Sequence, residues 1–135
     1  MSRIYKERSG FWASPVLVKD KIYIGSNNGF MYCLTADKGE VVWKYQARGP
    51  IWGTSPVVDG RVVFGDKAGW IHMLSADDGK QISEIKIGDN INSTPVVLDG
   101  RIYIGAFNGH LYCLEPDPSV PEPTPTPAPA GRRRR

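Results

Sequence analysis

Histidine and cysteine are the side chains of this sequence best suited to act as bases, metal ligands or nucleophiles, and each occurs twice. Neither His72 nor His110 has a nucleophile or a second ligand at a spacing that suits catalysis or zinc binding. Cys33 and Cys113 are too few for a disulfide framework, so they fix no redox compartment. These residues therefore predict neither a catalytic centre nor a metal centre.

Carboxylates could hold a cation or act as bases, but most of them follow one local pattern. They lie in predicted hairpin turns, where aspartate is favoured for its backbone geometry. The aspartates of these turns are Asp20, Asp37, Asp59, Asp77, Asp78 and Asp99. We interpret them as turn residues rather than as ligands or catalytic groups.

An internal repeat of about 40 residues spaces these turns. Ser14, Ser55 and Thr94 each open a Ser/Thr-Pro-Val segment, at spacings of 41 and 39 residues. Three further positions recur at a spacing of 40 residues, namely Gly25/Gly65/Gly105, Gly29/Gly69/Gly109 and Leu34/Leu74/Leu114. Markers that recur in phase indicate tandem copies of one structural unit, which we place at about residues 11–50, 51–90 and 91–115.

Each copy divides into short β-rich runs separated by turns. The strands expected in the first copy are residues 15–18, 22–24, 30–34 and 41–45. No window has helical periodicity, and the short connections make consecutive strands antiparallel neighbours. The sequence therefore predicts an all-β fold within residues 1–115: three four-stranded antiparallel blades of a β-propeller, as an open arc or as half of a six-bladed ring.

The third strand of each copy indicates that the blades stack on one another. One of its faces carries Met31/Ile71/Leu111 and Cys33/Met73/Cys113, and the other carries Phe30/Trp70/His110 and Tyr32/His72/Tyr112. A sheet with two apolar faces needs a neighbour on each side. We therefore interpret both histidines and both cysteines as residues that pack between blades, the cysteines as small buried hydrophobes.

The repeat resembles that of the PQQ-like, or quinoprotein-type, β-propeller family. The resemblance covers residues 11–115 and rests on SPVLVKDKIYIGSNNGFMYCLTADKGEVVWKY in the first copy and on SPVVDGRVVFG and GWIHMLSADDGK in the second. It implies that Trp43, with Ala36 and Gly39, belongs to the tryptophan-docking motif that fastens adjacent blades. Ser83 stands at the tryptophan position of the second copy, so we expect weaker docking there.

For a dehydrogenase of this family, the resemblance would imply a quinone pocket, a calcium ion held by carboxylate and amide ligands, and a catalytic aspartate. The sequence has no adjacent cysteine pair to cover a quinone and no Trp-rich capping stretch. We therefore expect no cofactor, no metal and no enzymatic activity. The favoured function is a protein–protein interaction or scaffolding module, similar to the propeller lipoprotein that scaffolds outer-membrane protein assembly. The alternatives are a fragment of a PQQ-dependent dehydrogenase whose active site lies on other blades, and a carbohydrate-binding propeller.

The expected binding face lies where each fourth strand crosses to the next first strand, beside the turns between second and third strands. Trp12, Trp52 and Asn92 share one phase of the repeat at that end. The neighbouring turns contribute Asn27, Asn28, Lys67, Phe107 and Asn108. Tryptophans at a strand entry would anchor a partner peptide, or else they would plug the gap between blades.

The two ends of the sequence suggest how the blades could be completed. The third copy lacks a fourth strand, and residues 2–8, with Ile4–Lys6 one period before Lys44–Gln46, could supply a closing strand. Three blades are too few for a known propeller. We therefore expect either a homodimer or further blades of a longer chain, with apolar blade faces left open in the isolated chain.

Composition excludes several other function classes. Most of the net charge of +3 comes from Arg132–Arg135, so no basic face predicts nucleic-acid binding. Residues 116–135 form a Pro/Thr-rich tail that we expect to be disordered and extended, with the arginine cluster at its end. No apolar run has membrane-spanning length and no signal peptide opens the sequence. The compartment stays open, although the family resemblance suggests an extracytoplasmic or periplasmic one.

Overall fold

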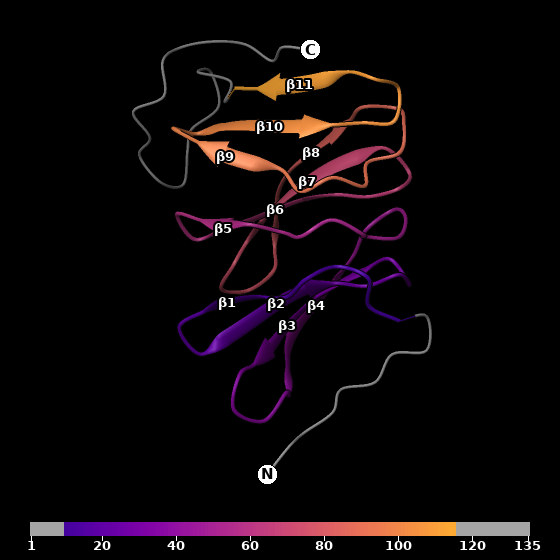
Figure 1. Cartoon of the computed structure of the whole chain (residues 1–135). Coiled ribbons are helices and arrows are strands. Elements are labelled where there is room, and N and C mark those ends of the chain that lie inside the picture. Colours follow the sequence, from indigo (N-terminus) through magenta and orange to yellow (C-terminus); the bar gives the residue numbers. More distant parts are fainter. Residues whose placement is uncertain (1–9, 116–135) are drawn as a thin grey trace.

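The structure is a computed structural model that describes residues 10–115, and it contains three antiparallel β-sheets and no helix in that range (Figure 1). Blade 1 consists of β1 (Val16–Val18), β2 (Lys21–Gly25), β3 (Phe30–Thr35) and β4 (Val41–Gln46). Blade 2 consists of β5 (Val57–Val58), β6 (Arg61–Gly65), β7 (Trp70–Ser75) and β8 (Gln81–Lys86). Blade 3 consists of β9 (Val96–Leu98), β10 (Arg101–Gly105) and β11 (Leu111–Leu114).

Every blade is a simple meander, because its strands pair in sequence order. The all-β propeller-blade fold expected from the repeat is therefore confirmed, and the strand limits differ from the expected ones by a residue or so at several ends. Blade 3 has three strands in the described range, as expected. The possible closing strand in residues 2–8 and the tail at 116–135 lie outside the described residues.

Two kinds of turn recur with the same backbone geometry. Gly29, Gly69 and Gly109 have φ angles of 92°, 94° and 85°, and each donates its N–H to the carbonyl oxygen three residues earlier, at 3.1 Å. Asp59 and Asp99, which open the Asp-Gly turns, both have a φ of 52°. Aspartate tolerates this left-handed conformation better than most residues, so its interpretation as a turn residue is confirmed at these positions.

The blades stack face to face, from blade 1 at the bottom of Figure 1 to blade 3 at the top. We call the side of a blade that points toward the next blade its forward face, and the opposite side its back face. The forward face of blade 1 and the back face of blade 2 form one core, which includes Tyr23, Met31, Cys33, Val62, Phe64 and Leu74. The forward face of blade 2 and the back face of blade 3 form a second core, which includes Val63, Ile71, Ile102, Ile104, Tyr112 and Leu114.

The outer blades correct two expectations about packing. Cys33 is fully buried between blades, but Cys113 is only half-buried, because no described residue forms a further blade against the forward face of blade 3. His110 is exposed rather than packed, since it precedes β11 at the solvent-facing end of the blade. At the other end, Tyr32 is buried on the back face of blade 1, where Phe11 contacts its ring edge-on.

Candidate functional site

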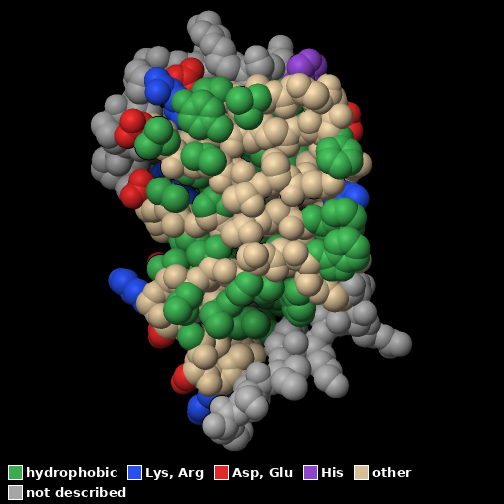
Figure 2. Space-filling model, viewed as in Figure 1, with side chains coloured by type: hydrophobic (Ala, Val, Ile, Leu, Met, Phe, Trp, Pro, Cys, Tyr) green, Lys and Arg blue, Asp and Glu red, His purple; other side chains and the backbone are tan. Residues whose placement is uncertain are grey.

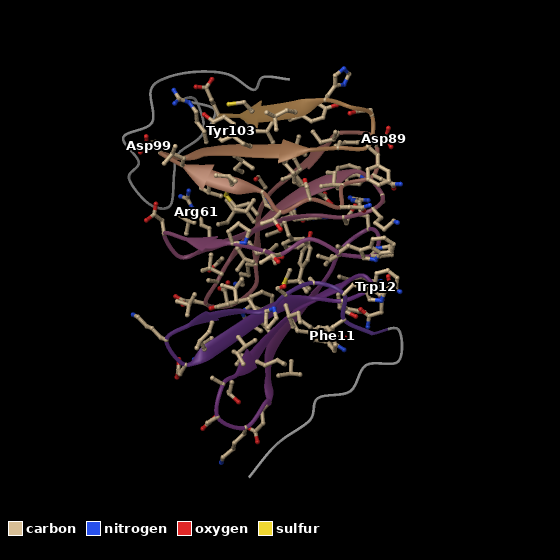
Figure 3. All side chains as sticks on the ribbon, viewed as in Figure 1. Phe11, Trp12, Arg61, Asp89, Asp99 and Tyr103 are labelled. Carbon is tan, nitrogen blue, oxygen red and sulfur yellow. The ribbon has the colours of Figure 1, made fainter. Side chains whose placement is uncertain are left out.

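Two tryptophans from neighbouring blade entries stack on each other at one end of the blades. The ring centroids of Trp12 and Trp52 are 4.5 Å apart and their planes differ by 21°. Trp12 nevertheless keeps 63% of its surface exposed. Figure 3 shows Trp12 at the right-hand edge, the same edge as Asp89 and opposite the hairpin turns marked by Arg61 and Asp99.

Polar groups from the turns between second and third strands hold the inner tryptophan. Trp52 donates its indole N–H to the Asn27 side-chain oxygen at 2.7 Å. The Lys67 ammonium lies 3.4 Å from the centre of the Trp52 ring, a cation–π contact. Trp12, Trp52, Asn27 and Lys67 therefore form one surface cluster, which we call the tryptophan face.

The other residues expected at this end have different surroundings. Asn28 and Asn108 brace their own turns, because their amide groups donate to the hydroxyls of Tyr32 and Tyr112 at 3.0 and 2.7 Å. Phe107 is 67% exposed on the β10–β11 turn. Phe107 contributes an apolar side chain to the same class of turn as Asn27 and Lys67, whereas Asn28 and Asn108 are turn residues.

Asn92, at the position equivalent to the two tryptophans, is half-buried. Its side-chain oxygen is buried and has no hydrogen-bond partner. An amide in this place offers no aromatic surface, so the tryptophan stack does not continue to blade 3.

Trp43 on β4 contacts blade 2 through its indole ring. Its indole N–H donates to the Ala76 carbonyl oxygen at 2.9 Å, and the Tyr23 hydroxyl donates to the same oxygen at 3.2 Å. Burial raises the pKa of Tyr23 to about 12. A Cβ atom on Gly79 would lie 2.5 Å from the Trp43 ring, so only glycine leaves room for the indole.

Trp43 thus contacts Ala76 and Gly79 of the next blade. Ala76 and Gly79 are the blade 2 equivalents of Ala36 and Gly39, and Ala76 is buried while Ala36 is exposed. Ser83 pairs with Met73 as Trp43 pairs with Cys33, so the blade 2–blade 3 junction lacks the corresponding indole.

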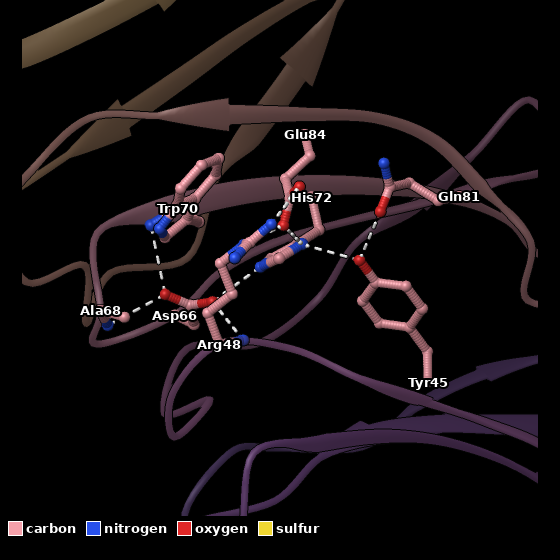
Figure 4. Close-up of polar contacts among 8 residues, drawn as sticks. All are labelled: Tyr45, Arg48, Asp66, Ala68, Trp70, His72, Gln81 and Glu84. Carbon is pink, nitrogen blue, oxygen red and sulfur yellow. Dashed lines mark hydrogen bonds and ion pairs between the residues drawn. The ribbon is translucent and has the colours of Figure 1, made fainter.

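A buried polar network, which the sequence analysis missed, lies in the blade 1–blade 2 junction (Figure 4). Asp66 follows β6 and is fully buried. Its carboxylate accepts the backbone N–H groups of Ala68, Trp70 and Arg48 at 2.9, 3.1 and 3.1 Å. The same carboxylate lies 2.6 Å from Nε2 of His72, which is also fully buried. Because Asp66 acts as an acceptor throughout, we place the proton on Nε2.

The far side of the His72 ring faces two further groups. Nδ1 lies 3.2 Å from the Tyr45 hydroxyl and 3.7 Å from the Glu84 carboxylate. The Tyr45 hydroxyl donates to Gln81 at 2.8 Å, and burial raises the pKa of Tyr45. Arg48 pairs with Glu84 through two hydrogen bonds, which hold the pKa of Glu84 below its usual range. The Arg48 guanidinium also covers the Trp70 ring at 4.1 Å.

This network joins blade 1 to blade 2. Tyr45 and Arg48 come from β4 and the segment after it, whereas the other side chains come from blade 2. Asp66 and His72 expose none of their side-chain surface, so neither can reach a substrate. His72 also stacks on Phe64 with centroids 4.9 Å apart, which confirms its packing role.

One sequence signal could have found Asp66. It occupies the position of Ser26 in the first copy and Ala106 in the third, so it is a carboxylate where the repeat otherwise has a small residue. His72 is likewise the exception to Tyr32 and Tyr112. Two exceptions in one copy, on adjoining strands, are the pattern expected of a buried pair.

The sequence comparison agrees with the fold. A family model described as outer membrane protein assembly factor BamB, the PQQ-like repeat model, matches residues 5–82, more than half of the 135 residues. The chain belongs to the PQQ-like β-propeller repeat family. No curated protein sequence matches the chain.

Solved structures share this propeller fold at low sequence identity. BamB from Moraxella catarrhalis is 17% identical with a TM-score of 0.71, over 84% of this chain and 36% of that one. The quinohemoprotein alcohol dehydrogenase ADHIIG from Pseudomonas putida HK5 is 19% identical with a TM-score of 0.75, over 96% of this chain and 20% of that one. The computationally designed Ika4 protein is 15% identical with a TM-score of 0.73, over 82% of this chain and 68% of that one. This PQQ-like chain thus spans about a third of BamB and a fifth of the dehydrogenase.

Among residues 10–115, no helix has the length and apolar character needed to cross a membrane.

Proposed function

We propose that this chain is a non-catalytic β-propeller module that binds a protein partner through its tryptophan face. The observation that carries the proposal is the stacked pair of Trp12 and Trp52, whose outer ring is 63% exposed although it is rigidly supported. Tryptophan is enriched among residues that dominate binding energy, because it buries a large area at a small entropic cost.

The charge on this face suggests what the partner presents. Among the described residues, the Lys67 ammonium forms no ion pair and lies over the Trp52 ring. An acidic side chain of the partner could meet the ammonium while an apolar side chain covers Trp12. We therefore infer an exposed peptide segment that combines an aromatic or aliphatic residue with a carboxylate.

The family supports a partner of this class. The matching family model is described as an outer membrane protein assembly factor, and the BamB fold is reproduced over 84% of this chain. This supports a role in which the blades hold other proteins rather than a substrate.

The second candidate, a piece of a quinone-dependent dehydrogenase, fits these residues poorly. Within residues 10–115, no group of three His, Cys, Asp or Glu side chains could hold a metal ion. Cys33 and Cys113 lie in blades 1 and 3, so they cannot form an adjacent pair over a quinone. No observation on the described blades favours this candidate over binding through the tryptophan face.

The test selects peptides from a displayed library on the immobilised chain and measures their dissociation constants by fluorescence anisotropy. We expect enriched peptides with acidic and aromatic residues, whose affinity falls about tenfold or more in Trp12→Ala. Lys67→Met should weaken only the peptides that carry a carboxylate.

The control is Ile82→Ala, because Ile82 is 38% exposed on β8 of the middle blade, away from the tryptophan face and from both open blade faces. Peptides whose affinity is unchanged in Trp12→Ala, or a selection without enrichment, would refute the proposed function.

A further inference from the structure

The forward face of blade 3 is an apolar surface that no described residue covers. Figure 2 shows hydrophobic side chains distributed over all three blades on one side of the molecule. On this face, Val96 and Leu98 of β9 are 57% and 59% exposed, and Leu111 of β11 is 67% exposed. Tyr103 and Cys113 pair across β10 and β11 on the same face and are half-buried. Exposed apolar patches of this kind usually mark an interface.

The same face already forms an interface elsewhere in the molecule. The blade 1 equivalents of Tyr103, Leu111 and Cys113 are Tyr23, Met31 and Cys33, and these three are buried against the back face of blade 2. The tyrosine and the cysteine are the same in both blades. The third position has the branched Leu111 in blade 3 and the unbranched Met31 in blade 1, and both side chains are apolar. The forward face of blade 3 therefore has the residue types of a surface that packs on a blade.

The back face of blade 1 is the matching surface. It carries Ile22, Ile24, Tyr32 and Leu34, and blade 3 has identical residues at the equivalent positions: Ile102, Ile104, Tyr112 and Leu114. In blade 3 those four residues are buried against the forward face of blade 2. In blade 1, Ile22 and Ile24 are only half-buried.

From these two equivalences we propose that blade 3 of one chain packs its forward face on the back face of blade 1 of a second copy, and that two such junctions close a six-bladed dimer. The junction continues the stacking already present at the blade 1–blade 2 and blade 2–blade 3 junctions. The interface is self-complementary under a twofold axis, since each copy contributes one face of each kind. A specific interface needs roughly 1,000 Å² of buried surface, and the ring would bury two pairs of blade faces at once.

One polar contact follows from the same equivalence. Tyr23 donates its hydroxyl proton to the Ala76 carbonyl oxygen across the blade 1–blade 2 junction. Tyr103 is the equivalent of Tyr23 and Ala36 is the equivalent of Ala76. The Tyr103 hydroxyl should therefore donate to the Ala36 carbonyl oxygen of the second copy. In the single chain described here, Ala36 is exposed.

Sedimentation velocity of the 135-residue chain from 1 to 100 µM tests the proposal, with a dimer expected in the upper part of that range. Leu111→Lys places a charge in the junction and should raise the dimer dissociation constant by about 100-fold or more. The control is Ile82→Lys, because Ile82 is 38% exposed on β8 of the middle blade and lies on neither open blade face, so it should leave the dimer intact.

Thiol modification gives a second readout that does not depend on the variant. Cys113 should react with a maleimide more slowly as the chain concentration rises through the dimer range, while the fully buried Cys33 stays unreactive throughout. In a Leu111→Lys chain with unchanged circular dichroism, the Cys113 rate should no longer depend on concentration.

A monomer at 100 µM would overturn the proposal. So would a rate of Cys113 modification that does not depend on the concentration of the wild-type chain. Open-ended oligomers would also overturn it, because they would show that the junctions do not close. The dimer test measures association and Cys113 reactivity in chains that keep Trp12, whereas the test of the proposed function measures peptide affinity. Either proposal can therefore fail while the other holds.

Discussion

Gly79→Ala tests whether the Trp43 indole fastens blade 1 to blade 2. Two physical effects add in this variant. Gly79 has a φ of 73°, and a side chain in the left-handed region costs roughly 1–2 kcal/mol. The new Cβ atom would also lie 2.5 Å and 2.6 Å from two atoms of the Trp43 ring, so the indole must move. Overpacking of this kind costs typically about 1–3 kcal/mol.

Gly60→Ala is a closely matched control for the backbone effect. Gly60 has the same φ of 73°, but nothing lies within 4 Å of the Cβ atom that alanine would add. We therefore expect Gly60→Ala to lower the free energy of unfolding by roughly 1–2 kcal/mol. Gly79→Ala should lower it by roughly 2–5 kcal/mol, and the difference isolates the contact with Trp43.

Urea unfolding at one fixed protein concentration measures the three free energies, with m-values compared to confirm that the transition is unchanged. A third arm repeats both glycine substitutions in a Trp43→Ala background, where Gly79→Ala should cost no more than Gly60→Ala. Equal destabilisation of the two variants in the wild-type background would refute the reasoning, because it would show that moving the Trp43 indole does not change the free energy of unfolding.

Three further predictions concern the polar network and the cofactor. Asp66→Asn should lower the free energy of unfolding by about 3–5 kcal/mol, because it weakens a buried acceptor of three backbone N–H groups and of His72. The control Asp59→Asn, in an exposed turn, should change it by less than about 0.5 kcal/mol. Thermal and urea unfolding compare the two variants. The lowered pKa of Glu84 stabilises the fold above the usual glutamate range, and this contribution is lost as pH falls through the lowered value. Wild type should therefore lose more stability than Glu84→Gln in an acid titration, and the difference should shrink in 1 M salt. Pyrroloquinoline quinone with calcium should shift neither the melting temperature nor the quinone absorbance, and a stoichiometric, calcium-dependent shift would contradict the binding-module proposal.

The 40-residue repeat carries enough information to predict the blades. The Gly29, Gly69 and Gly109 turns and the two Asp-Gly turns need positive φ, so their identity reveals their geometry directly. The stacking of blades also follows from the sequence, because both faces of the third strand are apolar. These features repeat, and repetition separates a structural requirement from chance.

The polar network could not be predicted in the same way, because it depends on departures from the repeat. Asp66 and His72 are unlike their counterparts in the other copies, so the pattern gives them no role. Their contact, and its link to Arg48 on the preceding connection, arises only when blade 1 and blade 2 pack together. The stack of Trp12 on Trp52 has the same origin, since the two residues are 40 positions apart and meet across a junction.

The two junctions are held by unequal numbers of specific contacts, and this predicts an order of local opening. The first has the Trp43 indole, the Arg48–Glu84 pair and the Asp66 carboxylate, whereas the second has Ser83 in place of the indole and packs mainly through aliphatic side chains. In a linear array each unit is stabilised by its own contacts and by its neighbours. Amide protons of β10 should consequently exchange with deuterium sooner than those of β3, β6 and β7, and a protease should cut the β8–β9 connection before the β4–β5 connection. Blades 1 and 2 would then behave as one cooperative folding unit, to which blade 3 attaches and from which it detaches as a separate one.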